Sequence, residues 1–339
     1  MKKYLKGALH VHTNISDGLL PPQEVVAKLK SKGYDFIVFT DHGNNFNLSD
    51  FITDDMGLVL IPGVEINQDP AYHRNEFGIE PDIHMNALGV RGYNSDWRFI
   101  EEGDVATSIE KTLDLIRERG GVPTVNHPNW LVGMSIREMV NVNRDFLMEI
   151  GAAFDCCYGG NHNKESLETM WDILLTKGKK VYGVFTDDSH RYNDGPSEVG
   201  FDPGYNLGYV EVFAERDEKS ILEALTKGEF YASNGIYLDE YTVTNKGIKI
   251  KVKPDLESNG HNGVKIEPHE GVRYAIMFKG KMGMPLKVVY GTEAEYTFDG
   301  NEWEDYVRVK VVSNKTKDSE WQVERWQYYE ALFTQPVFK

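Results

Sequence analysis

Two histidines near the start of the chain alternate with a small apolar residue, in the stretch His10-Val11-His12, and Ser16-Asp17-Gly18 follows shortly after. In an extended strand, residues i and i+2 face the same side, so His10 and His12 would present two imidazoles side by side. Imidazole is a common neutral ligand of transition metals, and a turn at Ser16-Asp17-Gly18 can return the Asp17 carboxylate towards the histidines. The stretch therefore predicts part of a metal site, although a lone His-x-His is more often a pair of ordinary polar residues.

The same residue types recur at or near the ends of predicted strands farther along the chain. The chain has 10 histidines, and six of them fall at such positions, which a random scatter would not produce. The candidate metal ligands are His10, His12, Asp17, His42, Glu65, His84, His127, Asp188 and His190. A mixture of imidazole nitrogens and carboxylate oxygens suits zinc, manganese or iron, and suits calcium or magnesium alone poorly.

The elements that must position these residues alternate between strand and helix. After the first strand, apolar β-rich runs are predicted at 34–40, 58–66, 82–90, 122–128, 146–154, 180–186 and 209–213, and helices at about 25–32, 108–119, 166–177 and 218–227. This alternation is typical of a parallel sheet with helices outside. Closed into a barrel, the sheet would bring the strand ends together on one face, where barrels keep their chemistry. An open, doubly wound sheet is the alternative, but no Gly-x-Gly-x-x-Gly turn follows a strand to support a dinucleotide site.

The pattern changes from about Tyr241 onward. Ile248, Ile250 and Val252 alternate with lysines, and further short β-rich segments follow at 274–278, 287–290 and 306–312. Alternation with a period of two is typical of an antiparallel sheet with one buried face. We therefore predict two domains, a β/α barrel with the metal site over residues 1–238 and a small β-rich C-terminal domain over residues 239–339.

Composition narrows the classes of function. The chain has 339 residues and a formal charge of -16, which argues against binding a nucleic-acid polymer. The two cysteines, Cys156 and Cys157, are adjacent, so a disulfide framework is not expected. No signal-peptide pattern follows the N-terminus and no apolar run is long enough to span a bilayer, so we expect a cytoplasmic location without a membrane partner. The oligomeric state is not predicted.

The order of these motifs resembles the polymerase and histidinol phosphatase (PHP) superfamily. The resemblance is carried by His10-Val11-His12 with Ser16-Asp17-Gly18, Thr40-Asp41-His42, a strand-ending Glu65, Asn126-His127-Pro128, and the run Asp187-Asp188-Ser189-His190-Arg191. It spans about residues 1 to 235 and includes the expected motifs in order. The resemblance implies a distorted (β/α)7 TIM-like barrel and a centre of two or three divalent ions, zinc, manganese or iron.

The resemblance also implies which residues share each ion. His10, His12, Glu65 and Asp188 would hold a first metal. Glu65 would bridge to a second metal, held also by His84 and His127. Asp17, His42 and His190 would hold a third, although Asp17 stands where some members have histidine. His73 is an alternative to His84, which we prefer because it lies within an apolar strand.

The implied activity is that of a metal-dependent phosphoesterase acting on a small phosphorylated substrate. Closely spaced divalent ions lower the pKa of bound water and neutralise phosphate oxygens as charge develops. The expected catalytic residues are His10, His12, Glu65, Asp188, His190 and Arg191. For substrate binding we predict Arg191, as a bidentate phosphate contact or else a surface ion pair, Trp130, as a pocket wall or else a core aromatic, and the loop residues Asn161 and His162.

Two other functions stay open. The segment Phe230-Tyr231-Ala232-Ser233-Asn234-Gly235 resembles one in a PHP branch that includes a carbamate hydrolase, so hydrolysis of a carbamate, ester or amide on the same centre is the alternative. A non-enzymatic role, in which the C-terminal domain binds a partner or glycan, is less favoured because the ligand set is complete. Nuclease proofreading is disfavoured because the chain is short, acidic and lacks a polymerase.

Overall fold

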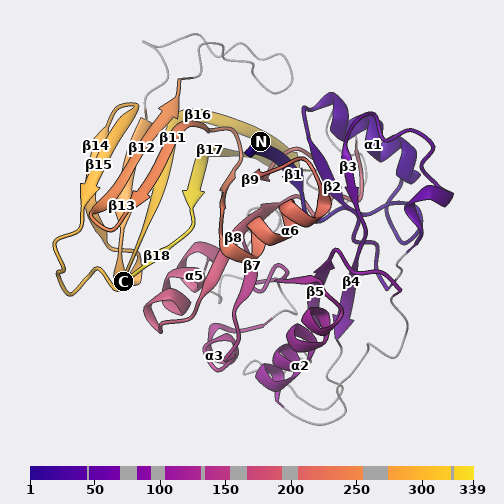
Figure 1. Ribbon diagram of the computed structural model, residues 1–339, viewed down its shortest axis with the longest axis horizontal. Coiled ribbons are helices and arrows are strands. Elements are labelled where there is room, and N and C mark those ends of the chain that lie inside the picture. Colours follow the sequence, from indigo (N-terminus) through magenta and orange to yellow (C-terminus); the bar gives the residue numbers. More distant parts are fainter. Residues whose placement is uncertain are drawn as a thin grey trace.

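The computed structural model describes residues 1–43, 46–68, 82–92, 104–130, 134–152, 166–192, 205–254, 274–321 and 324–339. Figure 1 shows helices packed outside the strands of the N-terminal part, and a group of long antiparallel strands from the C-terminal part beside them. The helices are α1 (Pro22–Ser31), α2 (Val105–Glu118), α3 (Ile136–Met139), α5 (Leu167–Thr176) and α6 (Glu218–Lys227). None of the described helices combines the length and the apolarity needed to cross a lipid bilayer.

The N-terminal strands belong to two sheets that meet at one end. One sheet includes the parallel strands β1 (Lys3–Ala8), β2 (Phe36–Val38) and β3 (Val59–Ile61). The other contains, in spatial order, β4 (Gly63–Gln68), β5 (Ile83–Leu88), β6 (Val122–Val125), β7 (Phe146–Ala152) and β8 (Val181–Thr186). Isolated bridges between Val11 and Ser189 and between His42 and Glu65 join the two sheets. These bridges lie among the predicted metal ligands.

The predicted α/β class is confirmed, but the strands do not form a uniformly parallel barrel. β5 is antiparallel to both β4 and β6. The single strand predicted at 58–66 is divided at Pro62, because proline has no N–H for the ladder, and its two parts, β3 and β4, pair in different sheets. Helix α6 occupies the predicted residues, begins at an Asp217 cap that accepts from the Ser220 N–H, and ends at Gly228 with a φ of 72°.

Strand register divides the interior of the five-stranded sheet into layers. Glu65, Asn86 and Thr124 are direct partners across β4, β5 and β6, so their side chains share one face. Two residues away on that face, Leu88 pairs with Val122, and both belong to a buried apolar cluster. The interior therefore changes from apolar at one end of the strands to polar at the end that carries the candidate ligands.

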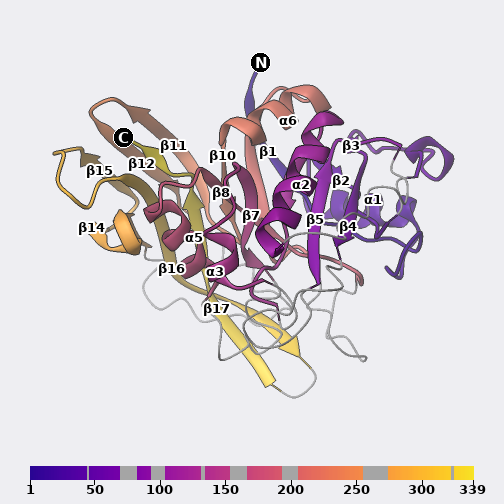
Figure 2. The same cartoon turned by 90° about the horizontal axis from the view of Figure 1, so that it is seen from below.

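The C-terminal part is antiparallel and is continuous with the sheet that contains β1. Its strands are β9 (Tyr209–Ala214), β10 (Phe230–Ser233), β11 (Tyr237–Thr244), β12 (Gly247–Lys253), β13 (Tyr274–Lys279), β14 (Pro285–Tyr290), β15 (Glu293–Thr297), β16 (Tyr306–Trp321), β17 (Glu324–Thr334) and β18 (Val337–Phe338). The larger sheet runs β14-β13-β16-β17-β10-β9-β1-β2-β3, with β18 paired to β16, and β11-β12-β15 form a separate sheet. In Figure 2 the β16–β17 hairpin projects beyond the rest of the molecule. The predicted domain boundary at 238/239 stays a prediction. Strand β10, before this position, pairs with β17, after it, so backbone hydrogen bonds cross the boundary.

A group of buried charges attaches the C-terminal strands to helix α5. Arg308 of β16 has no exposed surface, and its Nε and Nη2 donate to the Asp172 carboxylate over 2.8 and 2.6 Å. Arg308 also donates to Glu168 over 2.8 Å, and the ammonium groups of Lys279 and Lys310 contact the same carboxylate. We call these five residues the Arg308 cluster.

Candidate metal centre

All nine predicted ligands lie within the described residues and meet at the polar end of the N-terminal strands. His10 and His12 follow β1, His42 follows β2, His127 follows β6, and Asp188 and His190 follow β8. Glu65 lies within β4. His84 lies at the beginning of β5, and it reaches the same end because β5 runs antiparallel to its neighbours. The potential ligand atoms form three groups, each able to hold a metal ion.

The first group contains His10, His12, Glu65 and Asp188, all of them buried. The Nε2 atom of His10 lies 3.0 Å from Nε2 of His12, 3.0 Å from Oε2 of Glu65 and 2.9 Å from Oδ1 of Asp188. The Nε2 atom of His12 lies 3.1 Å from that Glu65 oxygen and 2.9 Å from that Asp188 oxygen. These four atoms therefore converge on one point.

The donor set of the first group fits a divalent transition metal. Zinc lies about 2.0–2.2 Å from imidazole and carboxylate ligands, which places tetrahedral ligands about 3.3–3.6 Å apart. The observed separations of 2.9 to 3.1 Å are slightly shorter, so small outward shifts would accommodate an ion. Oδ1 of Asp188 is buried and accepts no hydrogen bond from the described residues, as expected of an atom reserved for a metal.

The second group contains His42, Glu65 and His84, and its contact with His84 uses the other oxygen of Glu65. His127 is in none of the three groups found among the described residues, but it lies beside this one. Oε1 of Glu65 is 3.0 Å from Nδ1 of His84 and 3.6 Å from Nε2 of His127, while the Asn126 side-chain amide donates to it over 2.8 Å. The third member, His42, has its Nδ1 3.3 Å from Oε2 of Glu65. Glu65 thus faces the first group with one oxygen and the second with the other.

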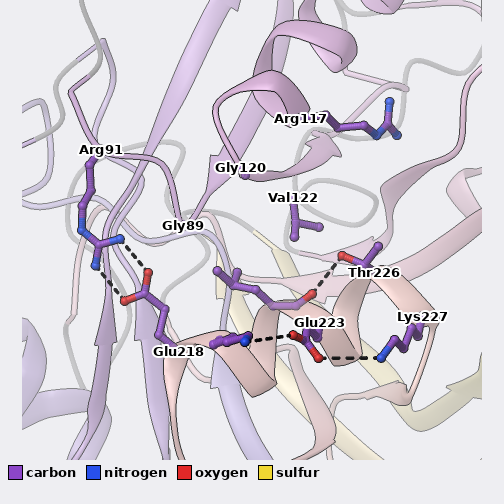
Figure 3. A pocket seen from close by; sticks show the side chains of 12 residues that line it. Gly89, Arg91, Arg117, Gly120, Val122, Glu218, Glu223, Thr226 and Lys227 are labelled. Carbon is purple, nitrogen blue, oxygen red and sulfur yellow. Dashed lines mark hydrogen bonds and ion pairs between the residues drawn. The ribbon is translucent and has the colours of Figure 1, made fainter.

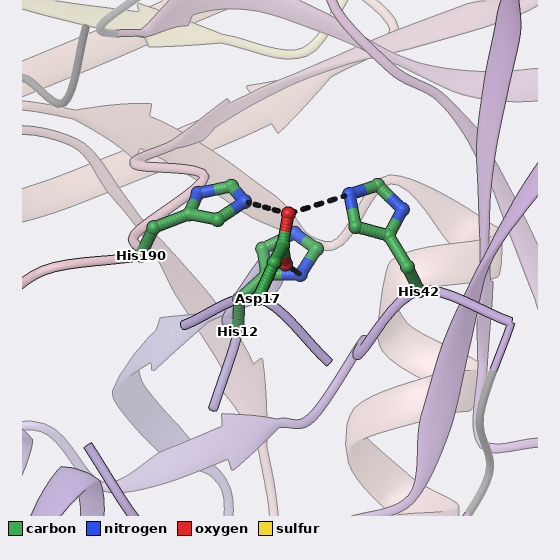
Figure 4. Close-up of side chains that lie close together, drawn as sticks. All are labelled: His12, Asp17, His42 and His190. Carbon is green, nitrogen blue, oxygen red and sulfur yellow. Dashed lines mark ion pairs between the residues drawn. The ribbon is translucent and has the colours of Figure 1, made fainter. Parts of the chain in front are cut away.

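The third group is more exposed and surrounds Asp17, as Figure 4 shows. The Asp17 carboxylate lies 3.3 Å from Nε2 of His190, 3.7 Å from Nε2 of His42 and 3.5 Å from Nδ1 of His12. The Asp17 side chain is 55% exposed, whereas those of His42 and His190 are about one quarter exposed. His12 and His42 therefore each border two groups with their two ring nitrogens.

The electrostatics of the first two groups favour charged side chains. Burial opposes ionisation of His10, but Asp188, Glu65 and Glu149 outweigh it and hold the pKa of His10 well above its usual value. Burial would likewise raise the pKa of Glu65, but His10, His42 and His84 hold it well below the usual value. Without a metal, protons on the imidazoles compensate the carboxylates. An ion that binds here must displace such protons.

Two ligand positions have unusual backbone conformations. His127 has a φ of 24° and Asp188 a φ of 49°, in the region that residues other than glycine rarely adopt. Positive φ at non-glycine residues persists where surrounding contacts enforce it, and it is common at functional sites. Each residue lies two positions after the last residue of a strand, His127 after β6 and Asp188 after β8. The local turn therefore directs both side chains back over the sheet.

Glu149 and Asn126 contact the predicted ligands but were not among the predicted site residues. Glu149 of β7 is fully buried and lies 2.8 Å from Nδ1 of His10. Asn67 of β4 makes similar contacts, with its amide oxygen and nitrogen each 2.9 Å from a ring nitrogen of His42 and His84. An acidic residue within the apolar run Phe146-Leu147-Met148-Glu149-Ile150 was the available sequence signal for Glu149.

Of the four predicted substrate-binding residues, Trp130 and Arg191 lie within the described residues. The Trp130 ring packs edge-on against the rings of His84 and His127, with centroids 5.4 and 5.2 Å apart. Arg191 is partly buried and directly follows His190. Asn161 and His162 lie outside the described residues, as does His73, the alternative to His84. The contact between His84 and Glu65 supports the choice of His84.

A separate cavity of about 640 Å³ lies at the other end of the strands, where Gly121 precedes β6 (Figure 3). Most of its charged side chains are paired with one another, while Arg117 pairs with Asp114, which is outside the lining. Arg91 donates through both Nη atoms to Glu218 over 2.7 Å, and Glu223 contacts Lys219 and Lys227. This cavity contains none of the three groups of potential ligands.

Comparison with known protein families gives a match over the part of the chain that contains the candidate metal ligands. The PHP domain family matches residues 8–193, which is more than half of the 339-residue chain. None of the curated proteins matches the chain. A two-domain protein from Bacteroides vulgatus, described as containing a predicted PHP-like metal-dependent phosphoesterase, is 17% identical, with a TM-score of 0.45 over 97% of this chain and 95% of that one. An amidohydrolase from Chromobacterium violaceum with bound sulfate and no metal is 14% identical, with a TM-score of 0.38 over 58% of this chain and 92% of its own.

Proposed function

This chain belongs to the PHP domain family, and from that premise we propose that it is a metal-dependent phosphoesterase acting on a small phosphorylated substrate. The observation that carries the proposal is the convergence of four atoms: His10 Nε2 and His12 Nε2 lie 3.0 Å apart, and each lies 2.9 to 3.1 Å from Glu65 Oε2 and Asp188 Oδ1. Because the second oxygen of Glu65 faces another group of imidazoles, two ions could share this carboxylate.

We propose two or three divalent ions, zinc, manganese or iron, with the following ligands. The first ion takes His10, His12, Glu65 and Asp188. The second takes Glu65, His84 and His127, with Nδ1 of His42 beside it. The third takes Asp17, His42 and His190, with Nδ1 of His12 beside it.

Bound ions would supply Lewis acidity and a nucleophile derived from water at neutral pH. The residues of the chain hold the ions, orient the substrate and limit access of water. Trp130 is proposed to form one wall of the pocket because its ring contacts His84 and His127. Arg191 is proposed to contact the phosphate, since a guanidinium can bind two phosphate oxygens together. The ions also offset the chain's formal charge of -16, which would otherwise repel a phosphate.

The test compares substrates on protein loaded with zinc, manganese or iron. We expect release of phosphate from an aryl phosphate or from a member of a nucleotide panel. Glu65→Gln should lower the rate by at least about 100-fold, because loss of a shared ligand exceeds the 10–100-fold effect typical of residues that support ligands. Glu211→Gln is the matched control. Glu211 is a buried glutamate of β9 outside the three groups, and burial raises its pKa to about 7, so a neutral isostere should change the rate less than twofold.

The alternative function, hydrolysis of a carbamate, ester or amide, is an arm of the same experiment. Aryl esters, carbamates and anilides cleaved much faster than the aryl phosphate would favour it. The segment that suggested it consists of strand β10 and the bend after it, where the Ser233 hydroxyl donates to the Ile236 carbonyl and Asn234 accepts from the Ala331 N–H. Absence of turnover on all these substrates with every metal would contradict both functions.

A further inference from the structure

We propose that Glu149 is a positioning residue that sets the orientation of His10 and His127 and so couples a proposed ligand of the first ion to a proposed ligand of the second. The inference rests on the proposed metal-dependent function, which assigns these histidines to two different ions. Glu149 itself is not proposed to touch an ion or the substrate. Its effect is transmitted through a ring nitrogen of one ligand and the backbone of another.

The contacts of Glu149 use both of its oxygens. Oε1 lies 2.8 Å from Nδ1 of His10 and accepts from the Thr186 hydroxyl over 2.7 Å. Oε2 accepts from the backbone N–H of His127 over 2.6 Å. The glutamate has no exposed surface, so water does not compete for these bonds. One buried carboxylate thus joins the segments that follow β1 and β6 to the last residue of β8.

The contact with His10 decides which ring nitrogen faces the metal position. An acceptor beside Nδ1 keeps a proton on that nitrogen and leaves the lone pair of Nε2 free. Nε2 is the atom that lies 3.0 Å from Glu65 and 2.9 Å from Asp188. Without an acceptor at Nδ1, the imidazole would exchange between tautomers, and one of them presents an N–H towards the ion.

The contact with His127 acts on the backbone. His127 has a φ of 24°, so its direction depends on bonds that hold this uncommon conformation. The N–H held by Glu149 is one of these bonds, and the His127 ring then lies with Nε2 3.6 Å from Oε1 of Glu65. Moving this backbone would move a proposed ligand of the second ion.

Glutamine at position 149 has the same shape but cannot satisfy all three donors. It offers one acceptor oxygen and one NH2 group. In one orientation the NH2 group faces the donors of His10 and Thr186, and in the other it faces the backbone N–H of His127. We expect Glu149→Gln to weaken zinc binding by about 10–100-fold, measured by competition with a chromophoric chelator. In zinc-loaded protein, ¹⁵N NMR should show His10 protonated at Nδ1 in the wild type and a second tautomer in the variant.

Two matched variants separate positioning from packing. Thr186→Val removes one donor and leaves both ligand contacts of Glu149, so zinc affinity should fall less than about threefold, well below the 10–100-fold typical of residues that hold ligands. Glu211→Gln, a buried glutamate that contacts no ligand group, should leave zinc affinity unchanged. Circular dichroism of each protein checks the fold. If Glu149→Gln does not fold, Glu149→Asp decides, because the shorter side chain cannot reach all three donors and should lose at least tenfold in affinity.

The proposal is overturned if the variant at position 149 binds zinc within twofold of wild type with an unchanged His10 spectrum. It is also overturned if Thr186→Val loses as much affinity as Glu149→Gln, since the effect would then come from disturbed packing. Neither readout uses turnover. Normal zinc binding by the wild type without hydrolysis of any substrate would sink the proposed function and leave the role of Glu149 intact.

Discussion

The metal centre and the Arg308 cluster are both buried groups of charge, but they are balanced differently. In the Arg308 cluster, three cationic side chains meet the carboxylates of Glu168 and Asp172. Arginine keeps its proton at all accessible pH values, and its N–H groups are directed at specific oxygens. Among the described residues the cluster pairs its cations directly with carboxylates, although Nη1 of Arg308 is buried there without a hydrogen-bond partner, and it fixes helix α5 to strand β16.

The metal centre contains only histidines and carboxylates, apart from the amides that contact them. Each histidine can lose its proton and become a ligand, and the ring nitrogens of His10 and His12 face each other at 3.0 Å. Buried charge alone therefore does not mark a functional site. The distinction lies in whether the positive partner is a permanent cation or a proton that an ion can replace.

The largest expected effect is on how the free energy of unfolding depends on pH, which should distinguish the metal centre from the Arg308 cluster. In metal-free protein, burial opposes protonation of His84, but Glu65 and Asp82 raise its pKa to about 10, and Asp188 and Asp17 similarly raise the pKa of His190 to about 9. A histidine with a raised pKa stabilises the fold fully below its ordinary value of 6.5, and this stabilisation is lost as pH rises through the raised value. At about 1.4 kcal/mol per pKa unit, the free energy of unfolding should fall on the order of 5 kcal/mol from His84 alone.

Urea unfolding of chelator-treated protein between about pH 5.5 and 10.5 measures this loss. With stoichiometric zinc the decline should disappear, because the ion takes the place of the protons. A metal-free protein whose stability does not change over this range would contradict the proposed difference between the metal centre and the Arg308 cluster.

The next effect concerns the Arg308 cluster. Arg308→Met should lower the free energy of unfolding by about 3–5 kcal/mol, because it leaves Asp172 buried without its bidentate partner. Zinc affinity should not change, since no member of this cluster contacts the metal centre. Urea unfolding at pH 7 and chelator competition measure the two quantities.

The control is Arg91→Met, which removes an equally well-formed pair with Glu218 at the surface, where the arginine side chain is 63% exposed. Its cost should stay below about 1 kcal/mol. Equal losses for the two arginines would show that burial does not account for the difference.

The smallest expected effect concerns another cation of the Arg308 cluster, Lys310. Lys310→Met should cost about 1 kcal/mol, because Glu168 retains Arg308 and Lys279 as partners and Lys310 is partly exposed to water. The variant is compared with Arg308→Met under the same conditions. A cost as large as that of Arg308→Met would mean that net charge, rather than the buried guanidinium, balances the cluster.

Much of the metal centre was predictable because ligand chemistry is carried by residue types. The period of two in an extended chain predicted that His10 and His12 face the same side, and their Nε2 atoms lie 3.0 Å apart although both residues follow β1. The order of His42, Glu65, His127 and Asp188 along the chain matches a family pattern. The strict alternation of Ile248, Ile250 and Val252 likewise predicted three side chains that the structure buries completely. Such features depend only on neighbours in sequence.

The sequence by itself determined which residue types could bind a metal, the α/β class and the faces of the strands, because these follow from residue chemistry and local periodicity. Only the tertiary structure decided which strands are neighbours and in which direction they run. The antiparallel β5 brings His84 to the ligand end from the beginning of its strand, and the pairing of β7 with β6 and β8 gives Glu149 its three donors. Both depend on contacts between residues far apart in the chain, whose free energies a local pattern does not contain.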